Sequence, residues 1–229
     1  MVQPLFQDRM QAGRRLAMAL GYLKTAHPLI LALPRGGVPV AYEIARTLDS
    51  DMDLLFVRKI GAPGHEEFAL GAVVDGATPQ LVLNADVVRS LAPSPNYIQA
   101  EMRRQLQEIA RRRRLYTGDR PAKPLTARTL VVVDDGIATG ATVRAALRGI
   151  RKAHPAKIVL AVPVGPHDTI EQLRDECDEI VCLATPEPFV AVGLHYAHFD
   201  QTSDEEVILL LRHAEIAASN RRRIEGQDG

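Results

Sequence analysis

The stretch "VVVDDGIATGAT", residues 131–142, decides how the rest of the chain is interpreted. Three valines are typical of a buried strand, and two adjacent acids, Asp134 and Asp135, follow them directly. Two neighbouring carboxylates repel each other, so their position at a strand end indicates that a ligand uses them. The alternative is an acidic strand end that caps the next helix and binds no ligand.

The segments around this stretch alternate between strand and helix patterns. Short apolar runs at 28–34, 53–59, 68–76, 129–134, 157–165 and 179–186 predict strands, and helical spacing of apolar residues predicts helices at 8–24, 38–48, 141–153, 168–176 and from about 204. Strand, glycine turn, helix and strand in this order predict an α/β fold, with a parallel twisted sheet flanked by helices.

The middle of the chain breaks this alternation. Residues 84–124 read as a short helix, a break at Pro93 and Pro95, and a longer helix with an apolar stripe from Ile98 to Ile109. This stretch is too long for an ordinary connection between strands, so we expect a helical insertion that forms an arm or lid.

Composition sets limits on the protein class. The chain has 229 residues, 46% of them hydrophobic, which predicts a single domain over 1–229. Lys+Arg and Asp+Glu both number 28, so the net charge points neither to nucleic acid nor to a membrane. No signal peptide or long apolar run is evident, and the two cysteines lack zinc-site spacing. We therefore expect a cytoplasmic protein with reduced thiols.

The residues after the acid pair are suited to a phosphate. Ligands of parallel α/β sheets collect beyond the carboxyl ends of the strands, where this loop would lie. Small residues let backbone N–H groups approach an anion, the following helix adds its dipole, and two threonine hydroxyls can donate hydrogen bonds. The predicted phosphate site consists of Ala138, Thr139, Gly140, Ala141 and Thr142. The carboxylates before it suit sugar hydroxyls or a hydrated Mg²⁺.

The strand, the acid pair and the phosphate loop of residues 131–142 together resemble the signature of the type I phosphoribosyltransferases. Gly136 departs from that signature, which usually has an apolar residue after the acids. Two further segments agree in order and spacing. "LALPRGGVPVA" (31–41) resembles the diphosphate loop, and "FVRKIGAPGHEEFALG" (56–71) resembles the strand with a basic pair and the mobile loop that covers the site. The resemblance covers a core of about residues 28–185, and the whole layout is similar to a little-characterised bacterial group of predicted phosphoribosyltransferases.

The resemblance implies a reaction and a set of roles. A 5-phosphoribosyl group would move from phosphoribosyl diphosphate to an acceptor, with Mg²⁺ as cofactor and Mg-diphosphate as leaving group. Asp134 and Asp135 would take the ribose hydroxyls and reach Mg²⁺ indirectly, with Lys59 as a third catalytic residue, in an enzyme of nucleotide metabolism. The residues implied to hold the diphosphate are Arg35, Gly36, Gly37, Arg58 and Lys59.

The acceptor is the least defined part of this interpretation. A hood built from the N-terminal helix and residues 186–204 would supply its site, and Phe189 and Tyr196 could stack on a planar nitrogenous base. Packing of these aromatic rings within a small subdomain is the other explanation, and nothing separates purine, pyrimidine or a non-base acceptor.

Two other classes of function stay open. A regulatory protein could sense phosphoribosyl diphosphate and bind nucleic acid through the arginine run 111–114, although the acids of the same helix and the neutral net charge disfavour this. A hydrolase of a phosphosugar diphosphate would use water as acceptor. We also expect a homodimer, by resemblance and because the apolar stripe of the long helix needs a cover, and a mobile segment from Ile60 to Phe68.

Overall fold

The computed structural model describes residues 3–63, 65–76 and 78–225. Its main sheet consists of five parallel strands in the order β2-β1-β6-β7-β8. Their bounds are β1 Leu29–Ala32, β2 Asp51–Leu54, β6 Thr129–Val133, β7 Lys157–Val164 and β8 Glu179–Ala184. The predicted parallel α/β sheet is therefore confirmed.

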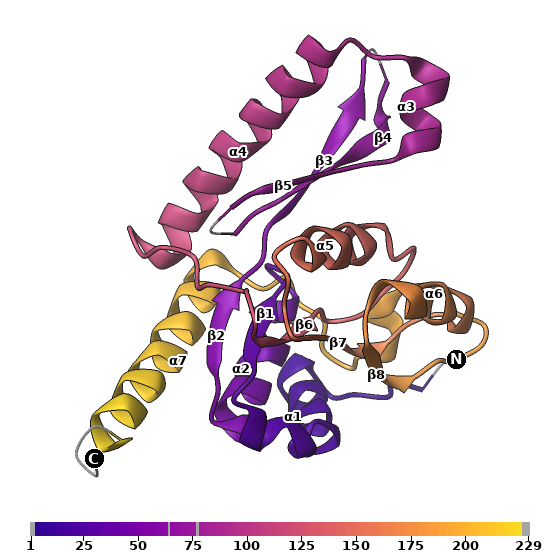
Figure 1. Ribbon diagram of the computed structural model, residues 1–229. Helices are drawn as coiled ribbons and strands as arrows, with labels where there is room; N and C mark the ends of the chain where they lie inside the picture. Colours follow the sequence, from indigo (N-terminus) through magenta and orange to yellow (C-terminus); the bar gives the residue numbers. More distant parts are fainter. Residues whose placement is uncertain (1–2, 64, 77, 226–229) are drawn as a thin grey trace.

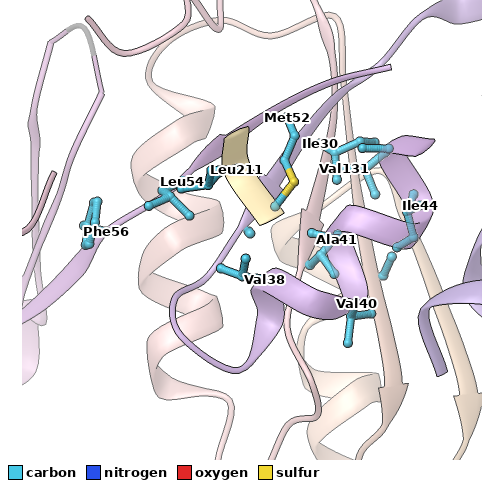
Figure 2. Close-up of a cluster of buried hydrophobic side chains, with 14 of the residues drawn as sticks. Ile30, Val38, Val40, Ala41, Ile44, Met52, Leu54, Phe56, Val131 and Leu211 are labelled. Atoms are coloured by element: carbon cyan, nitrogen blue, oxygen red, sulfur yellow. The ribbon is translucent and has the colours of Figure 1, made fainter. Parts of the chain in front are cut away.

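Helices cover both faces of this sheet. One face carries α1 (Arg9–Ala19), α2 (Gly37–Leu48) and α7 (Asp204–Glu225), and the other carries α5 (Ala141–Arg151) and α6 (His167–Gln172). Figure 2 shows the first interface, where Ile30 and Val131 of the sheet meet Ile44 of α2 near Leu211 of α7. The faces are apolar because the central strands are buried on both sides and contain mainly Val, Ile, Leu and Ala.

A second unit stands beside the main sheet, and we call residues 57–117 the outer module (Figure 1). It contains an antiparallel sheet of β3 (Val57–Ala62), β4 (His65–Val74) and β5 (Gln80–Leu83), followed by α3 (Ala85–Leu91) and α4 (Pro95–Thr117). The expected insertion at 84–124 does contain the two helices. It begins, however, as the continuation of a sheet, because β5 precedes it and pairs with β4.

The expected strand at 53–59 is two strands that belong to different sheets. The chain leaves the main sheet after β2, where the Leu55 N–H donates to the Ala32 carbonyl at 2.9 Å. The Phe56 N–H then donates to the Asp75 carboxylate at 2.8 Å, at the end of β4. An uninterrupted apolar run contains no signal for such a change of partner.

The segment from Ile60 to Phe68, expected as a loop, is mostly the tip of the β3–β4 hairpin. β3 continues to Ala62 and β4 begins at His65, while Gly64 lies outside the described residues. A tight hairpin satisfies backbone groups that an open loop would leave to water.

Arg113 of α4 fastens the outer module to the main sheet. Its guanidinium donates to the carboxylates of Asp75 (2.9 Å) and Asp53 (3.1 Å) and to the Leu54 carbonyl (2.8 Å). Burial raises the pKa of Asp75 to about 6, although the Arg113 charge acts in the opposite direction. One member of the arginine run is thus an internal residue.

Most of the apolar stripe of α4 packs within the chain. Ile109 is buried, Met102 and Leu106 are partly buried against the main core, and Ile98 is partly exposed. β3 and its neighbours cover much of the stripe, and the homodimer stays a prediction.

Candidate functional site

The acid pair follows β6, the middle strand of the main sheet. The Asp135 N–H donates to the Asp134 carboxylate at 2.9 Å, so the two acids are in direct contact. Burial, reinforced by the neighbouring Asp135 charge, raises the pKa of Asp134 well above its usual range. Ionisation of Asp134 is therefore disfavoured at this strand end.

Arg9, at the start of α1, compensates the charge of Asp135. Its Nε lies 2.7 Å from Asp135 Oδ2, and its Nη1 donates to the Asp200 carbonyl at 2.7 Å. The guanidinium also lies over the Phe199 ring, 3.9 Å from the ring centroid. Only 12% of the Arg9 side chain is exposed. Sequence reasoning missed this residue, because one arginine in an amphipathic helix has no distinguishing signal.

The predicted phosphate loop is largely open to solvent and is held by contacts with neighbouring segments, among them a hydrogen bond from the Thr169 hydroxyl to the Ala138 carbonyl at 3.1 Å. Ile137 is buried, and its N–H donates to the Val164 carbonyl at 2.9 Å. Ala138, Thr139, Ala141 and Thr142 are exposed in front of the N-terminus of α5. A helix N-terminus with exposed amides and two hydroxyls is suited to an anion.

Two glycines shape this loop. Gly140 has φ +72°, and a Cβ there would lie 2.8 Å from Thr169 Cγ2, so a side chain would be both strained and crowded. A Cβ on Gly136 would lie 2.5 Å from Val192 Cγ1. The departure from the family signature at Gly136 thus has a local reason: a valine from the segment 186–204 occupies the space of its missing side chain.

The loop after β1 lies against the acid pair. A Cβ on Gly36 would lie 2.1 Å from Asp135 Oδ2, and one on Gly37 would lie 2.6 Å from the Val133 carbonyl. The two glycines therefore allow a close approach of two loops that neighbouring strands deliver. The Gly37 N–H donates to the Leu33 carbonyl at 3.1 Å, so this amide already has a backbone partner, and a contact of Gly37 with a diphosphate stays a prediction.

Arg35, in the same loop, meets a carboxylate from the end of the chain. Its Nη1 lies 3.3 Å from Asp204 Oδ1 at the start of α7, and the Tyr116 hydroxyl donates to the same oxygen at 2.6 Å. The pKa of Asp204 is lowered, first by the Tyr116 hydrogen bond and then by the Arg35 charge. A third of the Arg35 side chain is exposed, so it can reach an anion beside the loop.

The basic pair of β3 does not act as a pair. Arg58 faces α4, where its Nε donates to Gln105 Oε1 at 3.1 Å. Lys59 points to the opposite side and lines a cleft together with Thr139 and Thr142. Successive side chains of a strand point to opposite faces, so the two residues lie on different sides of β3, and a diphosphate role for both stays a prediction.

The aromatic residues of 186–204 form a packed cluster with the N-terminal segment. Tyr196 is buried between Phe6 and Phe199, with ring centroids 5.4 and 5.0 Å away, and its hydroxyl donates to the Asp135 carbonyl at 2.6 Å. The Phe189 ring packs against the buried His195 ring, with 5.1 Å between the ring centroids. Tyr196 therefore supports the acid pair from inside and is not an exposed stacking platform.

The arginines of α4 are largely neutralised by acids of the same chain. Arg111 and Arg112 both donate to Glu108, Arg104 donates to Glu101, and Arg113 is internal. A helix with this internal pairing offers little unpaired positive charge to nucleic acid.

The family resemblance implies that the acid pair reaches magnesium indirectly. Within the described ranges no group of three or more His, Cys, Asp or Glu side chains could hold a metal ion. Asp135 is already paired with Arg9, which leaves it less available as a direct ligand. Carboxylate oxygens suit a hydrated Mg²⁺ that is held through substrate oxygens, and this role stays a prediction. In the part of the chain that the structure describes, no helix has the length and apolarity to cross a membrane.

A parallel sheet with an exposed Gly-Thr loop and an acid pair beyond its middle strand is typical of α/β proteins that bind phosphate groups. Residues 8–197 match the phosphoribosyl transferase domain, and the chain belongs to this family. It is 48% identical over 211 residues to predicted phosphoribosyl transferases from two strains of Mycobacterium tuberculosis, covering 92% of this chain and 47% of theirs. The chain thus spans about half the length of these relatives.

The fold is similar to that of a solved structure as well. The protein TT1426 from Thermus thermophilus superposes with a TM-score of 0.80 at 42% identity, covering 91% of this chain and 98% of the other. The similarity therefore includes the outer module as well as the main sheet.

Proposed function

We propose that this protein transfers a 5-phosphoribosyl group from phosphoribosyl diphosphate to a nitrogenous acceptor and releases diphosphate as its magnesium complex. The observation that carries the proposal is the contact between the two loops after β1 and β6, where Gly36 adjoins Asp135. This contact brings a candidate diphosphate loop, a sugar-binding acid pair and a phosphate loop to one edge of the sheet.

The 5-phosphate would lie on the loop 138–142. Its exposed small residues let the phosphate oxygens approach backbone amides, and the hydroxyls of Thr139 and Thr142 can donate to them. The positive end of α5 stabilises the dianion further.

The ribose hydroxyls would contact the acid pair. Asp134, with its raised pKa, can donate a hydrogen bond to one hydroxyl, and Asp135 can accept one from the other. As the anomeric carbon gains positive charge, the negative charge of Asp135 lies nearby. Arg9 limits that charge and holds the carboxylate in one orientation.

The diphosphate would lie beside Arg35 and Gly36, with Lys59 approaching from the outer module. Magnesium, when bound, would neutralise charge that develops on the leaving diphosphate, and Asp134 and Asp135 would hold it through ribose hydroxyls or water. Positioning and charge stabilisation are the main demands of such a displacement.

The acceptor would enter from the side of the hood, which we propose to consist of the N-terminal segment and residues 186–204. Among the residues there, Phe189 keeps a partly exposed ring. A homodimer remains part of the proposal on the strength of family resemblance alone, and solution scattering would test it.

Titration calorimetry with phosphoribosyl diphosphate and Mg²⁺ tests the donor site. We expect micromolar binding that Asp134→Asn, Asp135→Asn double substitution weakens by at least about tenfold. Diphosphate release should then require an added base from a panel of purines and pyrimidines. Release without any base would favour the hydrolase, and absence of donor binding would refute the proposal.

A further inference from the structure

A cleft of about 580 Å³ separates the outer module from α5. In Figure 1 the strands β4 and β5 lie beside this helix, and residues of both line the cleft. The volume lies within the range of about 300 to 1,000 Å³ that is typical of small-molecule sites. No role proposed above uses most of the residues that line it.

One end of the cleft is closed by close packing. A Cβ on Gly149 of α5 would lie 2.6 Å from the Cβ of Val74, so helix and sheet touch there. One turn further on, Lys152 Nζ donates to the Leu81 carbonyl at 2.7 Å and links the helix to β5. The two elements therefore diverge toward the N-terminus of α5.

The other end of the cleft opens onto the phosphate loop. Thr139, Ala141 and Thr142 line it at this end. Neither Asp134 nor Asp135 is among the described residues that line the cleft. A phosphate on the loop would therefore have the acid pair on one side and the cleft on the other.

The walls of the cleft differ in chemistry. The sheet side is aliphatic, with Val57, Ala72, Val82 and Leu83. Positive charge comes from Arg144 of α5, whose Nη2 lies 3.2 Å from Gln172 Oε1, and Lys59 of β3 also lines the cleft. Arg148 is present too, but Glu176 neutralises it through hydrogen bonds of 2.9 Å. Asn84 and Asp86 add polar groups, and the Asp86 carboxylate lies 3.5 Å from Arg89 Nη2. The cleft thus combines an arginine near the phosphate loop with an apolar wall and one ion-paired carboxylate.

We propose that the cleft binds a second group attached to the 5-phosphate of the ribosyl substrate or product, so that the ligand class is a nucleoside diphosphate ribose. The ribose would contact the acid pair, its phosphate the loop 138–142, and the second phosphate Arg144. The nucleoside would lie against the aliphatic wall. This proposal rests on the proposed function, because it places a phosphoribosyl unit at the same loop.

The test compares ADP-ribose with ribose 5-phosphate by titration calorimetry on the full chain. Both carry the same ribosyl phosphate, and only ADP-ribose extends into the cleft. We expect ADP-ribose to bind at least about tenfold more tightly and to compete with phosphoribosyl diphosphate, since both need the loop. Equal affinities, or simultaneous binding of the two ligands, would overturn the proposal.

A variant that fills the cleft provides the control on location. Ala145→Phe projects a ring from α5 into the cleft, and it should abolish the tenfold gain while leaving the affinity for ribose 5-phosphate unchanged. Ala110→Phe, at an exposed site on α4, should change neither. Arg144→Gln removes a charge without adding volume and should reduce the gain even if Ala145→Phe folds poorly. A gain that survives these cleft variants would refute the assignment.

Titration with phosphoribosyl diphosphate distinguishes failure of the cleft proposal from failure of the proposed function. If wild-type protein binds phosphoribosyl diphosphate but shows no preference for ADP-ribose, only the cleft proposal fails. If it binds neither phosphoribosyl diphosphate nor ribose 5-phosphate, the proposed function fails, and the cleft proposal fails with it.

Discussion

Replacing Arg9 by methionine should destabilise the protein by about 2 to 4 kcal/mol. Removal of one partner from a buried ion pair costs about 3 to 5 kcal/mol, while exposed pairs contribute at most about 1 kcal/mol. The Arg9 and Asp135 side chains are 12% and 15% exposed, which places the pair near the buried limit with a modest reduction for screening. The substitution would also leave Asp135 uncompensated beside Asp134 and remove the hydrogen bond to Asp200.

Equilibrium urea unfolding at pH 7.5 measures this effect as a lower midpoint at constant slope. Asp135→Asn should cost only about 1 to 2 kcal/mol, because the amide oxygen can still accept from Arg9 Nε. The double variant should then be less destabilised than the sum, with a coupling of about 1 to 2 kcal/mol. Arg15→Met, at an exposed site of the same helix, is the matched control. Additive effects, or an Arg9→Met variant as stable as this control, would refute the proposed pairing.

Three further predictions address separate features. Asp75 has its pKa raised to about 6, so its contribution to stability is fully present below about pH 4 and is lost as pH rises through 6. Relative to Asp75→Asn, the wild-type free energy of unfolding should fall by about 3 kcal/mol between pH 4 and 7, and a pH-independent difference in urea titrations would contradict this. Thr139→Val should weaken binding of phosphoribosyl diphosphate by about 1.5 to 3 kcal/mol in calorimetry without changing the melting temperature, whereas unchanged affinity would place the phosphate elsewhere. Gly36→Ala should displace the Asp135 carboxylate and lower donor affinity at least about tenfold; an unaltered Arg9 contact in a crystal structure of the variant would show that the loop yields instead.

The phosphate loop and the acid pair could be predicted because they are contiguous in the sequence. Their chemistry follows from residue types at adjacent positions, and the strand and helix on either side have clear periodicity. Arg9 and Asp204 could not be predicted, since their partners Asp135 and Arg35 lie 126 and 169 positions away. A lone charged residue contains no information about such a distant partner.

The orientation of two sets of residues follows from the sequence. Arg58 and Lys59 are neighbours in a strand, and the period of two requires that they point to opposite faces. The burial of Tyr196 agrees with the packing of aromatic rings, which was the alternative to a stacking platform. The split of 53–59 between two sheets had no such signal, because residues 54–57, where the change occurs, are all apolar and only the tertiary contacts with Ala32 and Asp75 separate the two strands.

The position of the outer module between β2 and β6 affects how the chain can fold. Leu29 pairs with Leu130, so the middle of the main sheet closes only after the whole module has been made. Within the module, Ile60 pairs with Gly71, and such local contacts form early. During synthesis, one edge of β1 therefore has no strand partner until β6 (Thr129–Val133) has left the ribosome. An exposed strand edge is a site of aggregation, so a chain truncated within α4 should depend on chaperones far more than the complete protein does.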